Sequence, residues 1–151
     1  MKKNKIRLIA IGLFLHNGRI LVFEGYDQVK EKYFYRPLGG AIKFGESGAD
    51  ALKREIREEI GKEIEDIRFQ GMIESRFMLR GEPGHEIVLV YSGRFVDASV
   101  CTRMDFTGHE DNGSEIKVRW MEASYFSENP GLLVPPELMD ILTRMQAGSV
   151  H

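Results

Sequence analysis

The sequence is poor in cysteine, with Cys101 as the single thiol among 151 residues. One cysteine excludes an internal disulfide, and such a chain is expected in a reducing compartment, the cytoplasm. The chain also lacks a strong charge of either sign, since its net charge is -2. A near-neutral chain has no broad attraction to a long nucleic acid or to an anionic membrane, so we expect small-molecule partners.

Long hydrophobic runs are missing too. The run at residues 8–15 follows the basic residues 1–5, as the apolar part of a secretory signal would. However, this run is too short to span a bilayer, and residues 16–19 (His-Asn-Gly-Arg) offer no small-residue cleavage site. We therefore predict a buried first strand here and no association with a membrane.

The sequence shows no internal repeat, low-complexity tract or linker. Hydrophobic residues make up 42% of the chain and charged residues 29%, a balance typical of a soluble globular protein. A chain of this length buries roughly two-thirds of its unfolded surface in one core. We therefore predict a single domain over residues 1–151.

Local patterns predict a set of strands. Asn17-Gly18 is a strong signal for a tight hairpin, and residues 80–84, with two glycines and a proline, predict a second turn. The segment 34–38 leads into the glycine pair Gly39-Gly40. The strands we expect are residues 6–15, 19–23, 67–79, 85–96 and 116–121, with the polar segment 101–114 as a loop.

Two helices are predicted as well. Ser47 can cap a helix over residues 46–60, and Gly61 lies where a helix commonly stops. Pro135-Pro136 can open a final helix, whose apolar stripe would be Leu138, Ile141, Leu142 and Met145. Strands before and after a single early helix, with another helix at the end, suggest a mixed α+β fold or an α/β/α sandwich.

The first helix carries a cluster of glutamates. Glu55, Glu58 and Glu59 are spaced by three and four residues, so they project within an arc of about 100°. Clustered carboxylates repel each other, and hard divalent cations such as Mg²⁺ or Mn²⁺ relieve the repulsion by taking oxygen ligands. An apolar stripe beside the cluster is expected to face the core and consists of Leu52, Ile56 and Ile60.

A solvated helix face is the alternative interpretation, because basic residues on the same helix could pair with these glutamates. The residues before the helix favour a ligand site. Gly39, Gly40 and Gly45 permit unusual backbone angles and close approach of a ligand to the main chain. The free N–H groups of a helix N-terminus also attract phosphate, so this stretch combines phosphate-binding and metal-binding features.

The spacing of these residues resembles the Nudix box, written G-x5-E-x7-R-E-U-x-E-E-x-G-U with U a bulky aliphatic residue. Gly40 is followed after five residues by Glu46, and seven more lead to REIREEIG at residues 54–61. Only the last position departs, because Lys62 replaces an aliphatic residue; Ile64 can supply the packing instead.

The rest of the chain is also similar to Nudix (MutT-like) hydrolases. The strand order agrees, as do the RPLGG sequence at residues 36–40 and the short strand with Trp120 before a terminal helix. The resemblance implies a Nudix-type α/β/α sandwich with a mixed central sheet. It also implies metal-dependent hydrolysis of a phosphoanhydride bond in a nucleoside diphosphate that is linked to another group.

The resemblance further implies roles for the residues of the box. Glu55, Glu58 and Glu59 match the principal ligands of Mg²⁺ or Mn²⁺, and the Gly40 carbonyl matches a backbone ligand. Arg54 matches the residue that orients a glutamate by ion pairing, so we count it with the catalytic residues. Glu46 matches a position whose role is structural or a weaker metal contact.

The general base is open at this point. Within the box, Glu55 or Glu58 is the most plausible residue. Outside it, Glu115 lies where similar proteins place an extra glutamate, and we predict that it is a catalytic residue and a metal ligand. Glu110 and Asp111 are the next candidates, and the alternative for Glu115 is a surface carboxylate at a strand edge.

Substrate contacts can also be proposed from sequence. Arg36 precedes the glycine pair and could provide a cation for the substrate phosphates, together with Gly39 and Gly40; a surface salt bridge is the alternative. The pair His85-Glu86, after the turn at residues 81–84, could line the cleft, but a histidine beside a turn is more often structural. Four aromatic residues could stack on a base, although most aromatics on strands belong to the core: Phe34, Tyr35, Phe77 and Tyr91.

Two other classes of function compete with hydrolysis. A Nudix-fold sensor that binds a nucleotide without cutting it typically lacks a glutamate of the box, whereas this chain keeps all of them. A plain structural domain with an acidic helix does not explain the filled box. The substrate could be a nucleoside triphosphate, a nucleotide sugar, a dinucleoside polyphosphate or a capped RNA end. The resemblance also allows a homodimer.

Overall fold

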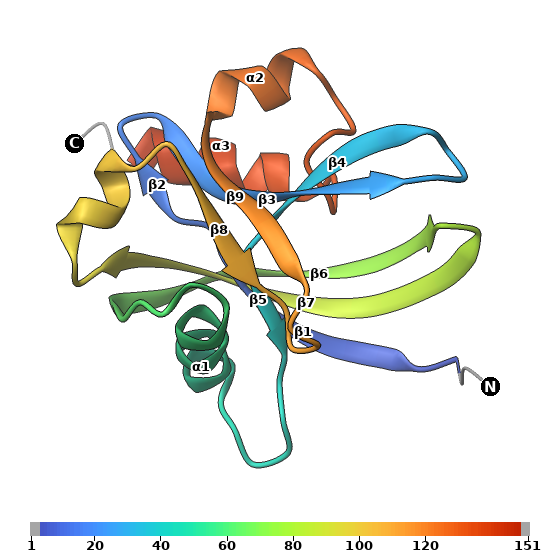
Figure 1. Cartoon of the computed structure of the whole chain (residues 1–151), viewed down its shortest axis with the longest axis horizontal. Helices are drawn as coiled ribbons and strands as arrows, with labels where there is room; N and C mark the ends of the chain where they lie inside the picture. The colour runs from blue at the N-terminus through green and yellow to red at the C-terminus, as the bar shows by residue number, and fades with distance from the viewer. Residues whose placement is uncertain (1–3, 149–151) are drawn as a thin grey trace.

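The computed structural model describes residues 4–148, which form three layers (Figure 1). Two sheets make up the middle layer. The first has the order β5-β1-β7-β6, built from β5 (Gly39–Ala41), β1 (Ile6–Gly12), β7 (Glu82–Phe95) and β6 (Ile64–Leu79). The second has the order β2-β3-β9-β8, built from β2 (Leu15–His16), β3 (Arg19–Asp27), β9 (Glu115–Glu122) and β8 (Asp105–His109), and β4 (Lys32–Pro37) also pairs with β3.

Strand directions and helix positions confirm the predicted fold class. The first sheet is mixed, because β1 runs parallel to β7 and antiparallel to β5, whereas the second is antiparallel. Helix α1 (Gly48–Ile60) lies on one side of the sheets, and α2 (Ala123–Glu128) and α3 (Leu138–Gly148) lie on the other (Figure 1). The chain therefore forms an α/β/α sandwich. None of the helices within residues 4–148 is long and apolar enough to cross a bilayer.

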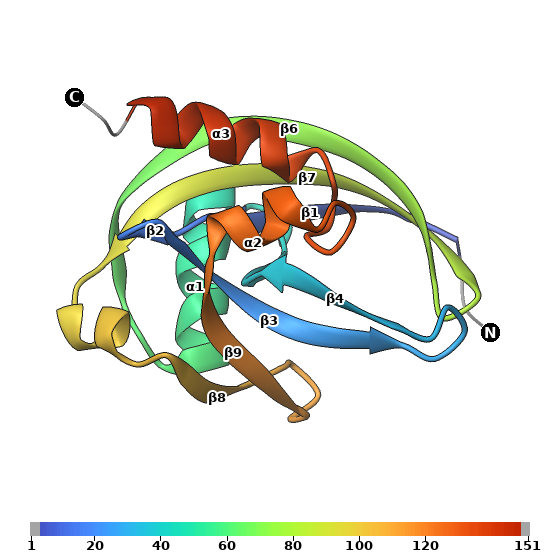
Figure 2. The ribbon, with the colours of Figure 1, turned by 90° about the horizontal axis from the view of Figure 1, so that it is seen from above.

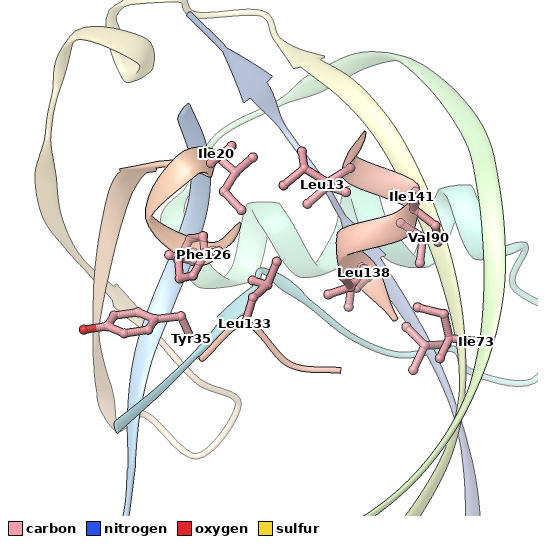
Figure 3. Close-up of a cluster of buried hydrophobic side chains, with 14 of the residues drawn as sticks. Leu13, Ile20, Tyr35, Ile73, Val90, Phe126, Leu133, Leu138 and Ile141 are labelled. Carbon is pink, nitrogen blue, oxygen red and sulfur yellow. The ribbon is translucent and has the colours of Figure 1, made fainter. Parts of the chain in front are cut away.

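Strand alternation divides the core into two clusters. Ile9 and Ile11 of β1 pack toward α2 and α3, whereas Ala10 between them packs toward α1. Figure 3 shows the first cluster, in which Ile73 of β6 lies near Leu138 of α3. Because each fully buried large aliphatic side chain contributes about 1.5–3 kcal/mol, these clusters hold the helices firmly against the sheets.

Two parts of the predicted layout are wrong. Residues 101–114 are not one loop, because a 3-10 helix (Ala98–Thr102) and strand β8 occupy much of this segment. Helix α2 was not predicted at all. Both elements are short and lack a regular apolar pattern, so contacts distant in sequence stabilise them. For example, the Trp120 indole Nε1–H donates to the Val100 carbonyl at 2.9 Å.

The two predicted turns are present. Asn17 and Gly18 have φ angles of 51° and 76°, and His16 pairs with Arg19 across them. These angles fit the tight hairpin turn that asparagine and glycine favour. The second turn is narrower than predicted, because β7 already begins at Glu82 and only residues 80–81 remain outside the strands.

Two long hairpins, β3–β4 and β6–β7, extend in the same direction with their tips side by side (Figures 1 and 2). Buried Asp27 joins the tips, because one carboxylate oxygen accepts the Val29 and Lys30 N–H groups and the other accepts the Arg80 N–H at 3.0 Å. The Arg80 bond is the main reason why the pKa of Asp27 is below its usual value. Lys30 Nζ also donates to the Met78 carbonyl at 2.7 Å. These hydrogen bonds therefore connect the tips of the two hairpins.

Candidate active site

Helix α1 is fixed at both ends by the residues that the sequence indicates. The Ser47 hydroxyl accepts the Asp50 N–H at 3.0 Å, so the helix begins at Gly48, two residues later than predicted. Gly61 adopts the left-handed conformation, with φ at 68°, and its N–H donates to the Arg57 carbonyl. These caps determine where the helix starts and stops along the sheet.

The rotation of α1 about its axis follows from its apolar stripe. Leu52 and Ile56 are fully buried, as predicted. Glu55 and Glu59, next to the stripe, are therefore buried as well, with 4% and 7% of their surface exposed. The side chain of Glu58 is 45% exposed. The acidic cluster thus extends from the core to the solvent.

The glycine pair brings the main chain directly against this cluster. A Cβ atom on Gly39 would lie 2.0 Å from the Ala10 carbonyl oxygen, and one on Gly40 would lie 2.4 Å from the Glu55 carboxyl carbon. Gly39, whose φ is 151°, donates its N–H to Glu59 at 3.1 Å. Neither position can carry a side chain without displacing backbone or a buried carboxylate, which explains why glycine is needed here.

Arg54 connects the loop and the glutamates. Its guanidinium binds both carboxylate oxygens of Glu46, at 2.7 and 2.9 Å, and donates to the Ala41 carbonyl at 3.0 Å. Its Nη1 donates to Glu55 at 2.8 Å and to Glu58 at 3.3 Å. The hydrogen bonds from Arg54 lower the pKa of Glu46 to about 2. Arg54 therefore fixes the orientation of three carboxylates with one planar group.

Burial opposes ionisation of the two inner glutamates. Burial, reinforced by the nearby charge of Glu55, raises the pKa of Glu59 to about 9. Burial also raises the pKa of Glu55, and the hydrogen bond from Arg54 only partly offsets this. Asp111 adds negative charge near both. A cation among these groups would favour their ionised forms.

The carboxylate that joins the cluster from outside α1 is Asp111. One oxygen each of Glu55, Glu58 and Asp111 lies within 4.8 Å of the others. Asp111 belongs to the turn between β8 and β9, which the bond from the Glu110 N–H to the Ser114 carbonyl closes at 2.9 Å. The turn therefore places Asp111, one of the next candidates after Glu115 for the general base, in the carboxylate cluster.

Glu115, the first choice from sequence, lies elsewhere. It is exposed at the start of β9, opposite His109 on β8, and it is not among the described residues that line the cleft. Pairing of β8 with β9 begins at this residue, so the turn residues before it reach over α1 instead. The structure shows no contact that supports a metal or base role for Glu115, and that role stays a prediction.

A cleft of about 370 Å³ opens above the cluster and contains most of the predicted site. Arg36, Gly39 and Gly40, predicted to contact substrate, all line it. The other residues of its lining that bear on the chemistry are Glu55, Glu59, Glu86, Glu110 and Asp111. Within residues 4–148, the lining includes neither Gly45 nor the first turn of α1, so the predicted phosphate contact at the helix N-terminus has no support.

Arg36 is held by a buried carboxylate. Its Nη2 lies 2.7 Å from an oxygen of Glu86, whose side chain is 5% exposed, and Arg7 lies 3.5 Å from the other oxygen. This pair differs from the surface salt bridge considered above, because one partner is buried and the other faces the cleft. Glu86, considered from sequence together with His85, does line the cleft, but its pairing with Arg36 was not predicted. Its spacing of two and four from buried Val88 and Val90 places it on an inward face.

The other residues considered for substrate binding do not line the cleft. Tyr35 and Tyr91 belong to the core, with 8% and 9% exposed. His85 pairs with exposed Glu74 at 2.9 Å, outside the cleft. Phe34 and Phe77 are half-buried and line a second cavity.

The donor set of the cleft fits a hard divalent cation. Its clustered donors are carboxylate oxygens, and no histidine or cysteine of residues 4–148 belongs to the cluster. Such all-oxygen sets suit Mg²⁺ or Mn²⁺. The close approach of Gly40 to Glu55 also leaves main-chain atoms beside the carboxylates, where a side chain would otherwise fill the space.

Fold and site together define a class of protein: an α/β/α sandwich whose acidic residues lie on a loop–helix–loop segment. The model of the NUDIX domain matches residues 6–139. The chain therefore belongs to the Nudix family.

Solved structures support the same fold. A NUDIX hydrolase from Nitrosomonas europaea is 16% identical and has a TM-score of 0.67, with 95% of this chain and 90% of that chain covered. The E. coli ORF135 protein is 20% identical and has a TM-score of 0.57, with 95% and 91% covered. A MutT NUDIX hydrolase from Burkholderia pseudomallei is 19% identical and has a TM-score of 0.52, with 80% and 86% covered.

Proposed function

We propose that this protein is a metal-dependent pyrophosphohydrolase that cuts a phosphoanhydride bond in a nucleoside diphosphate linked to a second group. The observation that carries the proposal is the convergence of Glu55, Glu58 and Asp111 within 4.8 Å beside the glycine turn. Glu55 is buried, whereas Glu58 and Asp111 are exposed. Carboxylates this close repel each other, and the repulsion costs stability unless a cation neutralises them. A site of this kind is maintained for a ligand rather than for folding.

Glu55, Glu58 and Asp111 would hold Mg²⁺ or Mn²⁺, and Glu59 and the Gly40 carbonyl, which belong to residues that line the same cleft, are the further candidate ligands. When bound, such a cation neutralises phosphate charge and lowers the pKa of a water molecule. The protein groups would orient the reactants. Arg54 fixes the carboxylates through its five-donor network.

Substrate phosphates would enter the cleft beside Arg36, which Glu86 keeps in place. A proton from the attacking water would pass to a carboxylate of the cluster. Glu55 is a candidate base, because burial raises its pKa toward neutrality. Asp111 is the candidate from outside the helix, and it takes precedence over Glu115 because it belongs to the cluster.

The test is hydrolysis of a panel of nucleoside diphosphate compounds with Mg²⁺, with Mn²⁺ or with a chelator, followed by nucleotide and phosphate release. We expect at least one compound to be cut only with metal. Glu58→Gln should lower that rate about tenfold or more, because it replaces an anionic ligand with a neutral one.

Glu63→Gln is the matched control, since Glu63 follows the same helix but pairs with Arg57 on the surface, at 2.6 Å. Its rate should stay within twofold of the wild type. Tight nucleotide binding with no hydrolysis of any compound would contradict the proposal and favour a nucleotide sensor. Equal rates for the Glu58 and Glu63 variants would contradict the role of the cluster.

A further inference from the structure

Strand β6 forms an open edge of the first sheet. It is the last strand in the order β5-β1-β7-β6, and Figure 2 shows it on the outside of the β6–β7 hairpin. Within residues 4–148, no strand pairs with its outer side. An unpaired edge presents a row of N–H and C=O groups that can pair with a strand from another chain. The outer side of β6 is therefore a surface to which a further strand can be added.

Only one part of this edge is regular. Register shifts interrupt the pairing of β6 with β7 before Gly71, and Arg144 covers the Gln70 carbonyl by donating a hydrogen bond to it. From Gly71 to Leu79 the pairing with β7 is continuous, and the turn at residues 80–81 follows. Residues 71–79 are therefore the open segment of the edge, and Ser75 is its midpoint.

Alternate residues of the open segment direct their backbone groups outward. Met78 lies opposite Pro83 on β7, and proline has no N–H to donate. Because bonded and non-bonded pairs alternate along an antiparallel ladder, the even-numbered residues from 72 to 78 direct their N–H and C=O groups away from β7. Lys30 Nζ donates to the Met78 carbonyl at 2.7 Å, as expected for an outward oxygen, and a second lone pair stays available.

The side chains of the same even-numbered residues are exposed. Met72 and Met78 are 64% and 47% exposed, and Glu74 and Arg76 are exposed between them. Arg76 forms no ion pair within the part of the chain that the structure describes. The odd-numbered residues alternate with them and face the interior, as buried Ile73 does. The outward row is therefore apolar at both ends and carries one charge of each sign in the middle.

This row is complementary to itself. If a second copy of the segment runs antiparallel with Ser75 opposite Ser75, then Glu74 faces the partner's Arg76 and Met72 faces the partner's Met78. These pairs join outward residues, so they can also exchange backbone hydrogen bonds. A slide of two residues places Glu74 opposite Glu74 or Arg76 opposite Arg76, and a slide of one pairs residues from opposite faces. One register therefore satisfies both the charges and the backbone.

We propose that residues 71–79 of β6 form a homodimer interface, in which two copies join their first sheets into one continuous sheet about a two-fold axis at Ser75. Each copy offers the same surface, as a two-fold contact requires. The contact is small because it consists mainly of one strand from each copy, so we expect a dimer that dissociates in the micromolar range or above. Its formation depends on neither the metal site nor the substrate.

Sedimentation velocity of the full chain, from micromolar to near-millimolar protein, tests this inference. The wild type should shift from monomer to dimer as its concentration rises. Glu74→Arg and Arg76→Glu should each weaken the dimer about tenfold or more, because each places like charges opposite one another at two positions. An equimolar mixture of the two variants should form the dimer again, since the two positive positions of one then face the two negative positions of the other.

Glu65→Arg is the matched control. It makes the same charge change on the same strand, at an exposed residue that pairs with Arg94 outside the open segment. Its dimerisation should equal that of the wild type. The inference is overturned if the wild type stays monomeric at the highest concentration or if Glu74→Arg dimerises as tightly as Glu65→Arg. It is also overturned if the mixed variants stay monomeric where the wild type dimerises.

Discussion

Replacing Glu59 with glutamine is expected to stabilise the metal-free protein at pH 7 by on the order of 3 kcal/mol. The pKa of Glu59 in the folded chain is about 9, against an ordinary value of 4.5. At pH 7 the folded chain therefore keeps Glu59 protonated, whereas the unfolded chain does not. Each pH unit from 4.5 to 7 lowers the free energy of unfolding by about 1.4 kcal/mol. Glutamine resembles the protonated carboxyl and can still accept the Gly39 N–H.

The stability of the metal-free wild type is expected to fall as pH rises. Between pH 4.5 and 9 the unfolded chain has lost the Glu59 proton while the folded chain keeps it, so stability falls as pH rises. Urea unfolding in chelator should therefore show that the free energy of unfolding of the wild type falls strongly from pH 5 to pH 8. For Glu59→Gln the fall should be smaller. Glu65→Gln, at an exposed position paired with Arg94, is the control and should resemble the wild type.

Bound metal should reverse the relative stabilities of the wild type and Glu59→Gln. A cation at a hundred times its dissociation constant stabilises the folded state by about 2.7 kcal/mol. The wild type should gain more from Mg²⁺ than Glu59→Gln, because only the wild type offers a full set of carboxylates. A Glu59→Gln protein that is less stable than the wild type in chelator at pH 8 would show that burial of Glu59 is not the dominant cost.

Replacing Arg54 with lysine is expected to lower kcat about a hundredfold. Arg54 contacts Glu46, Glu55, Glu58 and the Ala41 carbonyl through a single planar group. A lysine ammonium has three donors and no planar fork, so it cannot keep all these contacts. A displacement of a catalytic group by about 1 Å can cost a hundredfold in rate.

Arg57→Lys provides the matched control. Arg57 is on the same helix and binds both oxygens of one carboxylate, Glu63, at 2.6 and 2.8 Å, but on the exposed surface. Steady-state kinetics of both variants on the same substrate should show a large loss for Arg54→Lys and almost none for Arg57→Lys. If Arg54→Lys keeps its kcat within threefold, Arg54 does not orient the carboxylates that act in catalysis.

The parts of the molecule that sequence predicts well are those determined by local spacing. Helix α1 and its caps depend on Ser47, Gly61 and the apolar stripe, all within one short segment. The Asn17-Gly18 turn similarly depends on two residues and their preferred dihedral angles. The burial of Ile64, suggested in place of Lys62, follows from its position just after the helix.

The parts that sequence does not predict depend on contacts between distant residues. Arg36 meets Glu86 because two strands from different sheets approach, and no local pattern contains that pairing. Asp111 rather than Glu115 reaches the cluster because of the shape of one turn between β8 and β9. Phe34 lies opposite Gly25 and Phe77 opposite Gly84 on the neighbouring strands. These pairings follow from strand register, which the sequence does not reveal, so Phe34 and Phe77 could not be distinguished from core aromatics.

The central claim is that Glu55, Glu58 and Asp111 hold a divalent cation, and Mn²⁺ binding tests it most directly. Electron paramagnetic resonance measures the free Mn²⁺ that remains during titration of the wild type, Glu58→Gln and Glu63→Gln. We predict that the wild type and Glu63→Gln bind Mn²⁺ equally and that Glu58→Gln binds it about tenfold or more weakly. Equal binding by all three proteins, or no binding by the wild type at millimolar Mn²⁺, would contradict the account.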